Sequence, residues 1–166
     1  MTPVRTIVLD PEPATPEAFG PFGAVPGDEG APPTADLEFQ WNDGWVNYIG
    51  HDLDEIPVIE GRYRCELLNR HDTHTQTLMP VSDDALVVVA PAAVDFSLPA
   101  HFETVRAFFV PRYTCVHLAR GTWHWGPYPC AMPSVRIFNI QGRGYVRDNG
   151  IVWLARDLGV AYDICH

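Results

Sequence analysis

Two histidines, one in each of two short motifs, are the residues best suited to chemistry in this chain. The first motif is N-x-H-x4-Q over residues 69–76, and the second is A-x-G-x-x-H over residues 119–124. Imidazole has an unperturbed pKa near neutrality, so it can accept or donate a proton at physiological pH, and it is a common metal ligand. His71 and His124 are therefore the candidate catalytic residues, provided that the fold brings the two motifs together.

Strand alternation predicts which side chains of the first motif point inward. From Arg62 to His71, the odd-numbered positions are mainly apolar or neutral, whereas most even-numbered positions are charged. Successive side chains of a strand point to opposite faces, so the odd-numbered face should point into the protein. Asn69 and His71 then lie at the end of an inward-facing apolar row, where the mouth of a barrel places polar groups meant for a ligand.

The rest of the chain has the pattern of short strands separated by turns. The chain contains 16 prolines, which argue against a helical bundle. The clearest helix start is Thr15 followed by Pro16, and this helix should end near Gly20. Runs rich in β-branched and aromatic residues predict strands at WVNYI, RYRCELL, ALVVVA, TVRAFFV, YTCVHL, VRIFNI and IVWL. Their spacing predicts an all-β barrel or sandwich.

Composition and charge limit the number of domains and the kinds of partner that can be expected for this chain. With 166 residues, of which 46% are hydrophobic and 19% charged, the chain is expected to fold as a single domain over residues 1–166. The formal net charge of -10 argues against nucleic acid and anionic membranes as partners. The sequence shows neither a signal-like start nor an apolar run long enough to span a membrane, so we expect a cytoplasmic protein whose four cysteines are reduced.

The spacing of the two motifs matches the ligand pattern of the cupin class. Small cupin barrels carry His-x-His-x3-4-Glu on one strand pair, and a later Pro-x-Gly-x-x-His turn supplies a further histidine. In this chain Asn69, Gln76 and Ala119 stand in place of the first histidine, the glutamate and the proline. The expected fold is therefore a cupin-like double-stranded β-helix, or jelly-roll, barrel with short helices.

Longer segments resemble the ureidoglycolate lyase family, and they do so in the same order along the chain. The stretch TPEAFGPFGAV is similar to the family's opening. The later landmarks are WNDG, RHDTHTQTLMP, LVVVAP, VRAF and RGTWH, so that the resemblance extends from Thr15 to His124. The family usually has a glutamate at the position of Asn69, Tyr-His at the positions of Leu118 and Ala119, and a second histidine at the position of Trp125.

The resemblance implies a lyase that cleaves a carbon-nitrogen bond in a small ureido- or amide-bearing hydroxy acid. The family's own reaction releases urea and glyoxylate. His71 and His124 would transfer the protons, and an arginine would bind the substrate carboxylate through two parallel hydrogen bonds. The expected substrate-binding residues are Asn69, Gln76, Arg120, Arg136 and Trp125. Because several family residues are replaced, we expect weak or absent release of urea from ureidoglycolate itself.

Two rival functions and one cofactor are also compatible with the sequence. A non-catalytic small-molecule-binding cupin would keep the pocket without the reaction, and a metal-dependent cupin oxygenase would need a carboxylate ligand that the first motif lacks. One divalent metal ion, with His71, Gln76 and His124 as its ligands, is compatible with the cupin pattern. The resemblance further implies a small anionic substrate and a homodimer.

Overall fold

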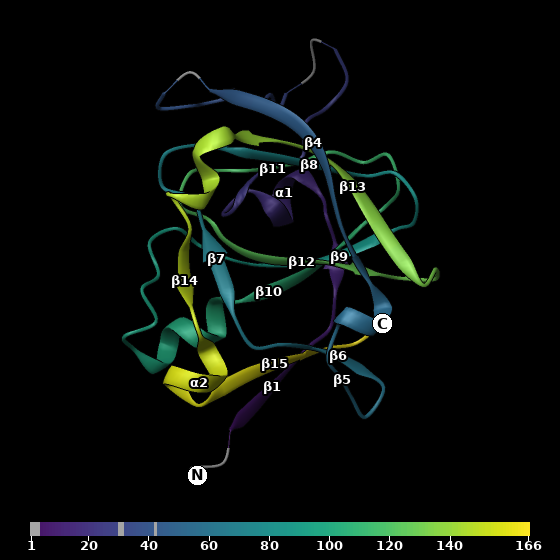
Figure 1. Ribbon diagram of the computed structural model, residues 1–166, viewed down its shortest axis with the longest axis vertical. Coiled ribbons are helices and arrows are strands. Elements are labelled where there is room, and N and C mark those ends of the chain that lie inside the picture. Colours follow the sequence, from purple (N-terminus) through teal and green to yellow (C-terminus); the bar gives the residue numbers. More distant parts are fainter. Residues whose placement is uncertain (1–3, 30–31, 42) are drawn as a thin grey trace.

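The computed structural model describes residues 4–29, 32–41 and 43–166, and most of its regular structure is β-strand (Figure 1). Asn42 of the WNDG landmark lies outside the described residues. The strands are β1 (Arg5–Leu9), β2 (Glu12–Pro13), β3 (Gly23–Ala24), β4 (Gly44–Asp52), β5 (Val58–Ile59), β6 (Arg62–Cys65), β7 (Leu68–Arg70), β8 (Gln76–Pro80), β9 (Ala85–Ala90), β10 (Arg106–Val110), β11 (Val116–Leu118), β12 (Trp123–Pro129), β13 (Ser134–Gly142), β14 (Gly150–Val152) and β15 (Val160–Ile164). The helices are α1 (Pro16–Phe19) and α2 (Leu154–Leu158), and the 3-10 turns are η1 (Leu53–Glu55), η2 (Pro99–Thr104) and η3 (Arg143–Val146).

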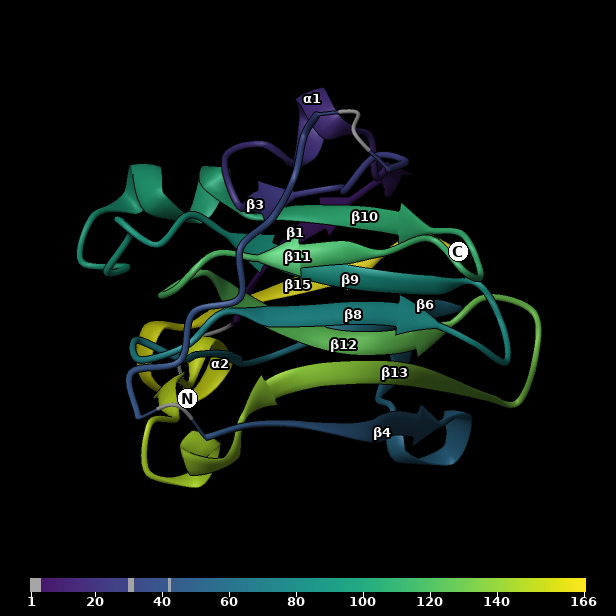
Figure 2. The same ribbon diagram turned by 90° about the horizontal axis from the view of Figure 1, so that it is seen from above.

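The strands form three layers, with a six-stranded sheet in the middle (Figure 1). This middle sheet has the strand order β14-β7-β12-β9-β10-β2. A five-stranded sheet, β3-β11-β8-β13-β4, covers one of its faces, and a four-stranded sheet, β1-β15-β6-β5, covers the other. Figure 2 shows the long strands of the five- and six-stranded sheets crossing the molecule in similar directions. These two sheets form the cupin-like barrel, which confirms the predicted all-β fold.

Strand β9 explains how the middle sheet is packed on both sides. All six of its residues are buried. Its odd-numbered residues belong to the core shared with β8, β11 and β13, whereas its even-numbered residues belong to the core shared with β6 and β15. A strand covered on both faces has a continuous hydrophobic sequence, not an alternating one, and ALVVVA is such a run.

The predicted strand from Arg62 to Leu68 is divided in two by the structure. The chain leaves the four-stranded sheet after β6 and enters the middle sheet at β7. Tyr63 and Cys65 are buried, as the alternation predicts. Leu68 is also fully buried, although it occupies an even position, because it packs into the core between the middle and four-stranded sheets. The next residue, Asn69, therefore faces the five-stranded sheet, as predicted.

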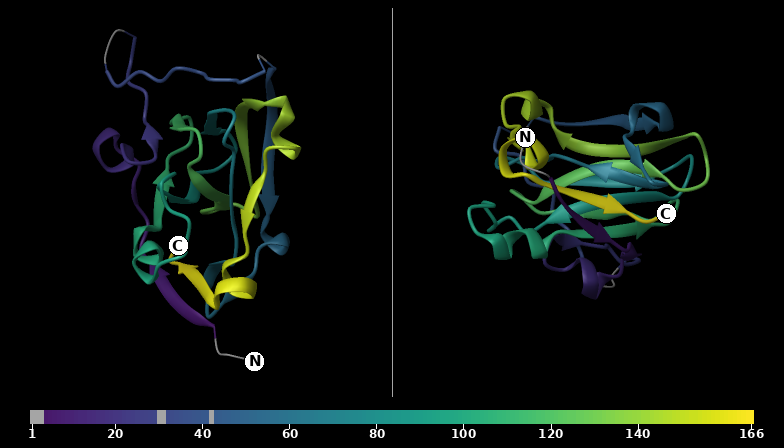
Figure 3. Two further views of the ribbon diagram at one scale, coloured as in Figure 1. Left: turned by 90° about the vertical axis from the view of Figure 1, so that its left-hand side faces the viewer. Right: turned by 90° about the horizontal axis from the view of Figure 1, so that it is seen from below.

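Seven of the described strands lie outside the predicted runs: β1, β2, β3, β5, β8, β12 and β15. Strand β12 contains Gly126, Pro127 and Pro129, which are typical of turns. The register of β12 against β9 shifts between Trp125 and Tyr128, and this irregularity accommodates the prolines within the sheet. Strand β8 is a short run, and β1 and β15 pair in parallel from opposite ends of the chain (Figure 3).

The helices are short, as predicted. The hydroxyl oxygen of Thr15 accepts a hydrogen bond from the backbone N-H of Ala18 at 3.2 Å, which confirms the predicted helix start. The run IVWL was expected to be a strand throughout, but α2 begins at its last residue, Leu154. No helix in the described part of the chain is long and apolar enough to cross a membrane.

Candidate functional site

A cavity of about 200 Å³ lies between the five- and six-stranded sheets. The structure brings Asn69, His71, Gln76 and His124 together in its lining, and Trp125 lines it as well. The predicted convergence of the two motifs is thus observed. An engineered protein cavity of about 150 Å³ binds benzene, so the volume of this cavity suits a small molecule.

Strand pairing explains how the two motifs meet. Asn69 on β7 lies directly opposite His124 on β12 in an antiparallel pair, and His71 directly follows β7. The ring centroids of His71 and His124 are 5.4 Å apart. Gln76 begins β8 in the five-stranded sheet and reaches the same cavity from the opposite side. The site is therefore built across the two facing sheets.

Hydrogen bonds fix the tautomers of the two cavity histidines. The Nδ1 atom of His71 lies 3.0 Å from the backbone oxygen of Asp148, and Nδ1 of His124 lies 2.9 Å from the backbone oxygen of Thr122. A carbonyl oxygen can only accept a hydrogen bond, so each Nδ1 carries the proton and donates it. In the neutral ring, Nε2 is then the basic nitrogen. Both histidines can therefore offer a proton acceptor to a ligand.

Burial keeps these imidazoles neutral. Desolvation, together with the neighbouring ring of His71, lowers the pKa of His124 to about 3. Desolvation also lowers the pKa of His71. His74 stacks on His71 with ring centroids 4.6 Å apart, and desolvation and His71 lower the pKa of His74 to about 4. His74 lies behind His71 and not in the cavity lining.

Lowering the pH from 7 to 4 should destabilise the folded protein. A histidine in the unfolded chain has a pKa of about 6.5, whereas the pKa is about 4 for folded His74 and about 3 for folded His124. Below pH 6.5 the unfolded state therefore takes up protons that the folded state does not bind, and stability falls until the folded pKa values are reached. Thermal unfolding followed by circular dichroism should show a falling midpoint over this range. The His74→Gln variant should show a shallower fall, and a wild-type midpoint that does not change would contradict the burial of neutral histidines.

Asp148 is distant from the first motif in the sequence but forms hydrogen bonds that stabilise it. Its carboxylate accepts hydrogen bonds from the backbone N-H groups of Asp72 at 3.1 Å and Thr73 at 2.8 Å, and from the hydroxyl of Thr73. Burial opposes ionisation of Asp148, but these donors outweigh it and lower its pKa. The same residue orients His71 through its backbone carbonyl. Asp148 is thus a positioning residue for His71.

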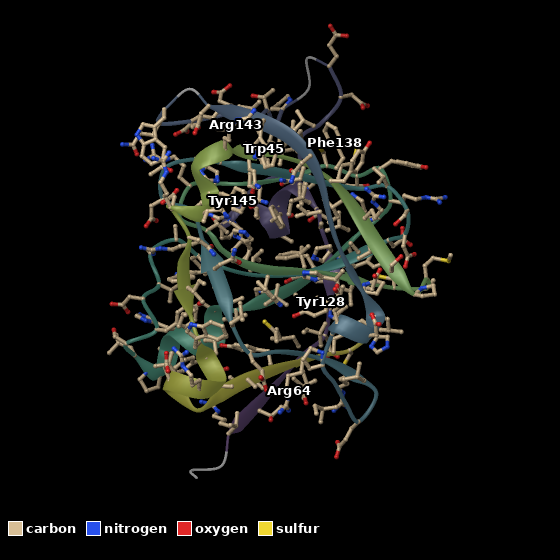
Figure 4. All side chains as sticks on the ribbon, viewed as in Figure 1. Trp45, Arg64, Tyr128, Phe138, Arg143 and Tyr145 are labelled. Carbon is tan, nitrogen blue, oxygen red and sulfur yellow. The ribbon has the colours of Figure 1, made fainter. Side chains whose placement is uncertain are left out.

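The segment from η3 to β14 supplies a wall of the cavity that the sequence analysis did not predict. Tyr145 and Asn149 line the cavity in this segment. Tyr145 stacks on Trp45 of β4, with ring centroids 6.3 Å apart and an interplanar angle of 11°, and the guanidinium of Arg143 lies 5.2 Å from the centre of the Trp45 ring (Figure 4). No recognisable motif marks these residues in the sequence, and only the fold shows their position.

The two arginines expected to bind a carboxylate do not line the cavity. Arg120 donates from Nε and Nη2 to the backbone oxygen of Asp72, at 3.0 and 2.8 Å. Arg136 is exposed on β13 and packs over the ring of Tyr48, 5.2 Å from its centre. Its neighbours Val135 and Ile137 point inward, so strand alternation directs Arg136 outward. Among the described residues, the cavity lining contains no Lys, Arg, Asp or Glu side chain.

A divalent metal, which is compatible with the cupin pattern, would meet an incomplete set of ligands. His71, His74 and Asp148 offer ligand atoms within 4.8 Å of one another, so this group could hold a metal ion. The Asp148 carboxylate, however, already accepts three hydrogen bonds that a metal would have to replace. The predicted ligands His71, Gln76 and His124 are all neutral, and no carboxylate in the described lining balances a divalent charge. The three predicted ligands therefore fit a divalent ion poorly.

Comparisons with known proteins point to one family. A family model described as ureidoglycolate lyase matches residues 53–140, which include both histidine motifs. A protein named ureidoglycolate lyase from Burkholderia cepacia is 32% identical over 163 residues, covering 87% of this chain and 84% of the relative. Proteins of the same name from Burkholderia mallei (strain NCTC 10229) and Stutzerimonas stutzeri (strain A1501) are 30% identical over 153 residues and 29% identical over 137 residues. They cover 82% and 73% of this chain, and 82% and 74% of their own length. The matched motifs are the ones that meet at the cavity, and the chain belongs to the ureidoglycolate lyase family.

Proposed function

We propose that this chain is a lyase that cleaves a carbon-nitrogen bond in a small ureido- or amide-bearing hydroxy acid. The observation that carries the proposal is the pair of histidines, His71 and His124, on a cavity of small-molecule size. Membership of a family whose matched relatives are named ureidoglycolate lyase supports the same reaction class.

The reaction moves one proton from oxygen to nitrogen and needs no oxidant. As the substrate hydroxyl loses its proton, an oxygen electron pair forms the new carbonyl bond. The carbon-nitrogen bond then breaks, its electron pair stays on nitrogen, and nitrogen takes up a proton. One histidine Nε2 can accept the hydroxyl proton and deliver it to the leaving nitrogen, while the second histidine accepts a hydrogen bond or relays the proton. The cycle begins with an unprotonated ring, and desolvation, which lowers the pKa of both histidines, leaves them in that form.

The wild-type chain should release the nitrogen-containing product from a panel of α-hydroxy acids that carry a ureido or acylamino group on the same carbon. We expect cleavage above the rate without enzyme. Cleavage of ureidoglycolate itself should be slower, by about 100-fold, than cleavage of the best substrate, because one positioned proton-transfer group contributes about that much and Asn69, Leu118 and Ala119 replace family residues. Urea or amide release and glyoxylate formation can be measured together to verify the balance.

Two results of this assay would change the account. Ureidoglycolate turnover as fast as that of any other substrate would contradict the expected divergence from the family reaction. Binding of the whole panel without cleavage of any member would instead support a non-catalytic binding barrel.

A further inference from the structure

We propose that the cavity binds the nitrogen-bearing end of its ligand on the side chains of Asn69 and Gln76, and leaves the carboxylate end toward solvent. The inference rests on the proposed function and adds the orientation of the substrate and the residues that select for it. Within the described part of the chain, two buried side-chain oxygens have no hydrogen-bond partner, and the cavity lining has no charged side chain.

Gln76 presents its carbonyl oxygen as a free acceptor. Its Nε2 atom donates to Oδ1 of Asn139 at 2.8 Å and to Oε1 of Gln141 at 3.3 Å. Asn139 in turn donates from Nδ2 to Oδ1 of Asn47 at 2.6 Å, so three strands hold this amide chain in place. Oε1 of Gln76 is buried and has no hydrogen-bond partner among the described residues. A buried carbonyl oxygen without a donor is unfavourable, and an N-H group from a ligand would satisfy it.

Asn69 presents a second free acceptor from the opposite sheet. Its Nδ2 atom donates to Oδ1 of Asn149 at 3.1 Å. Its Oδ1 atom is buried and, like Oε1 of Gln76, accepts no hydrogen bond from any residue that the structure describes. Both residues line the same cavity. The two oxygens therefore offer hydrogen-bond acceptors from both of the sheets that enclose the ligand.

The charge of the cavity decides which end of the ligand enters. A terminal amide or ureido group is neutral and brings N-H donors that match the two free oxygens. A carboxylate brings only acceptors, so it would leave both oxygens unsatisfied and would lose its hydration without gaining a cation. No described lining residue is Lys or Arg. The carboxylate end is therefore expected to stay in contact with water.

The matched pair glycolamide and glycolate tests this inference, because the two molecules differ in a terminal amide against a terminal carboxylate. Titrations of the wild-type protein, followed by nuclear magnetic resonance, should show glycolamide binding at least about tenfold more tightly than glycolate. The Asn69→Ala and Gln76→Met variants should each lose at least about tenfold in glycolamide affinity. The Gln40→Met variant is the matched control, because Gln40 is exposed and does not line the cavity.

Several results would overturn the inference. These are equal or tighter binding of glycolate, no saturable binding of glycolamide, or unchanged glycolamide affinity in both variants. If Gln76→Met does not fold, as judged by its thermal unfolding, Asn69→Ala alone decides the outcome. Failure of the proposed function is distinguished by a separate measurement, since it would appear as a lack of substrate cleavage by the wild-type protein.

Discussion

Replacing His124 with alanine should lower the rate of carbon-nitrogen bond cleavage by at least about 100-fold. A positioned proton-transfer group contributes about 10²–10⁴ to the rate, and His124 is a half-buried, oriented base on the cavity. The loss should appear in kcat, because proton transfer belongs to the chemical step and not to ligand binding. His71→Ala should have an effect of similar size. The double variant should lose little more than either single variant, because residues that act as one unit are not additive.

The control for this experiment is His101→Ala. His101 lies on η2, where its Nδ1 atom is 3.0 Å from the Asp95 carboxylate, and it does not line the cavity. Its replacement should leave kcat unchanged. A His124→Ala variant that turns over the best substrate at the wild-type rate would remove His124 from the catalytic site.

Replacing Phe108 with alanine should lower the free energy of unfolding by about 3–5 kcal/mol, the range observed for buried phenylalanines. Phe108 is fully buried on β10, where its ring centroid lies 5.0 Å from that of Phe19 and 5.6 Å from that of Phe22. These contacts hold the N-terminal helix against the barrel, and the substitution leaves a cavity between them. Urea denaturation followed by circular dichroism should show a lower midpoint with an unchanged slope.

Phe138→Ala provides the comparison within the same fold. Phe138 (Figure 4) is only partly buried on the outer side of β13. Its ring makes an edge contact with exposed Tyr48. Its replacement should cost less than half as much as Phe108→Ala, because water can fill the space that it leaves. Equal losses for the two variants would mean that the core around Phe108 is not the main source of stability.

The strands that contain a continuous or an alternating hydrophobic run were predictable from the sequence. The run at β9 is hydrophobic throughout because both faces are buried, and the long run at β13 alternates because one face is more exposed. Strand β12 was missed because its glycine and prolines are typical of turns, although the irregular pairing with β9 accommodates them. The division between β6 and β7 was also missed, because a change of sheet leaves no signal in the alternation before it.

The part of the candidate site that belongs to the two histidine motifs was predictable from the sequence. The cavity positions of Asn69, His71, Gln76 and His124 follow from motif spacing and strand alternation. The positions of the arginines did not follow, because the type of a residue does not reveal which face of the sheet it occupies. For Arg136, the inward-pointing neighbours on β13 already indicated the outer face.

The supporting wall was not predictable from the sequence. The carboxylate of Asp148 accepts hydrogen bonds from backbone N-H groups of the first motif, and its backbone oxygen accepts one from His71. Such contacts depend on the fold and not on a sequence motif. Tyr145 and Asn149 reach the cavity from the segment between η3 and β14, beyond the residues that the family model matches.

A crystal structure with ureidoacetate, the substrate-like acid that lacks the carbinol hydroxyl, tests most directly whether the cavity is the active site. Without that hydroxyl the ligand cannot undergo the cleavage reaction, so the wild-type protein can be used, and elemental analysis of the same sample shows whether a metal is bound. The account predicts that ureidoacetate occupies the cavity, with its central carbon beside the Nε2 atoms of His71 and His124 and its ureido nitrogens about 3 Å from the free oxygens of Asn69 and Gln76. Ureidoacetate bound elsewhere on the protein, with this cavity filled only by water, would contradict the assignment of the site.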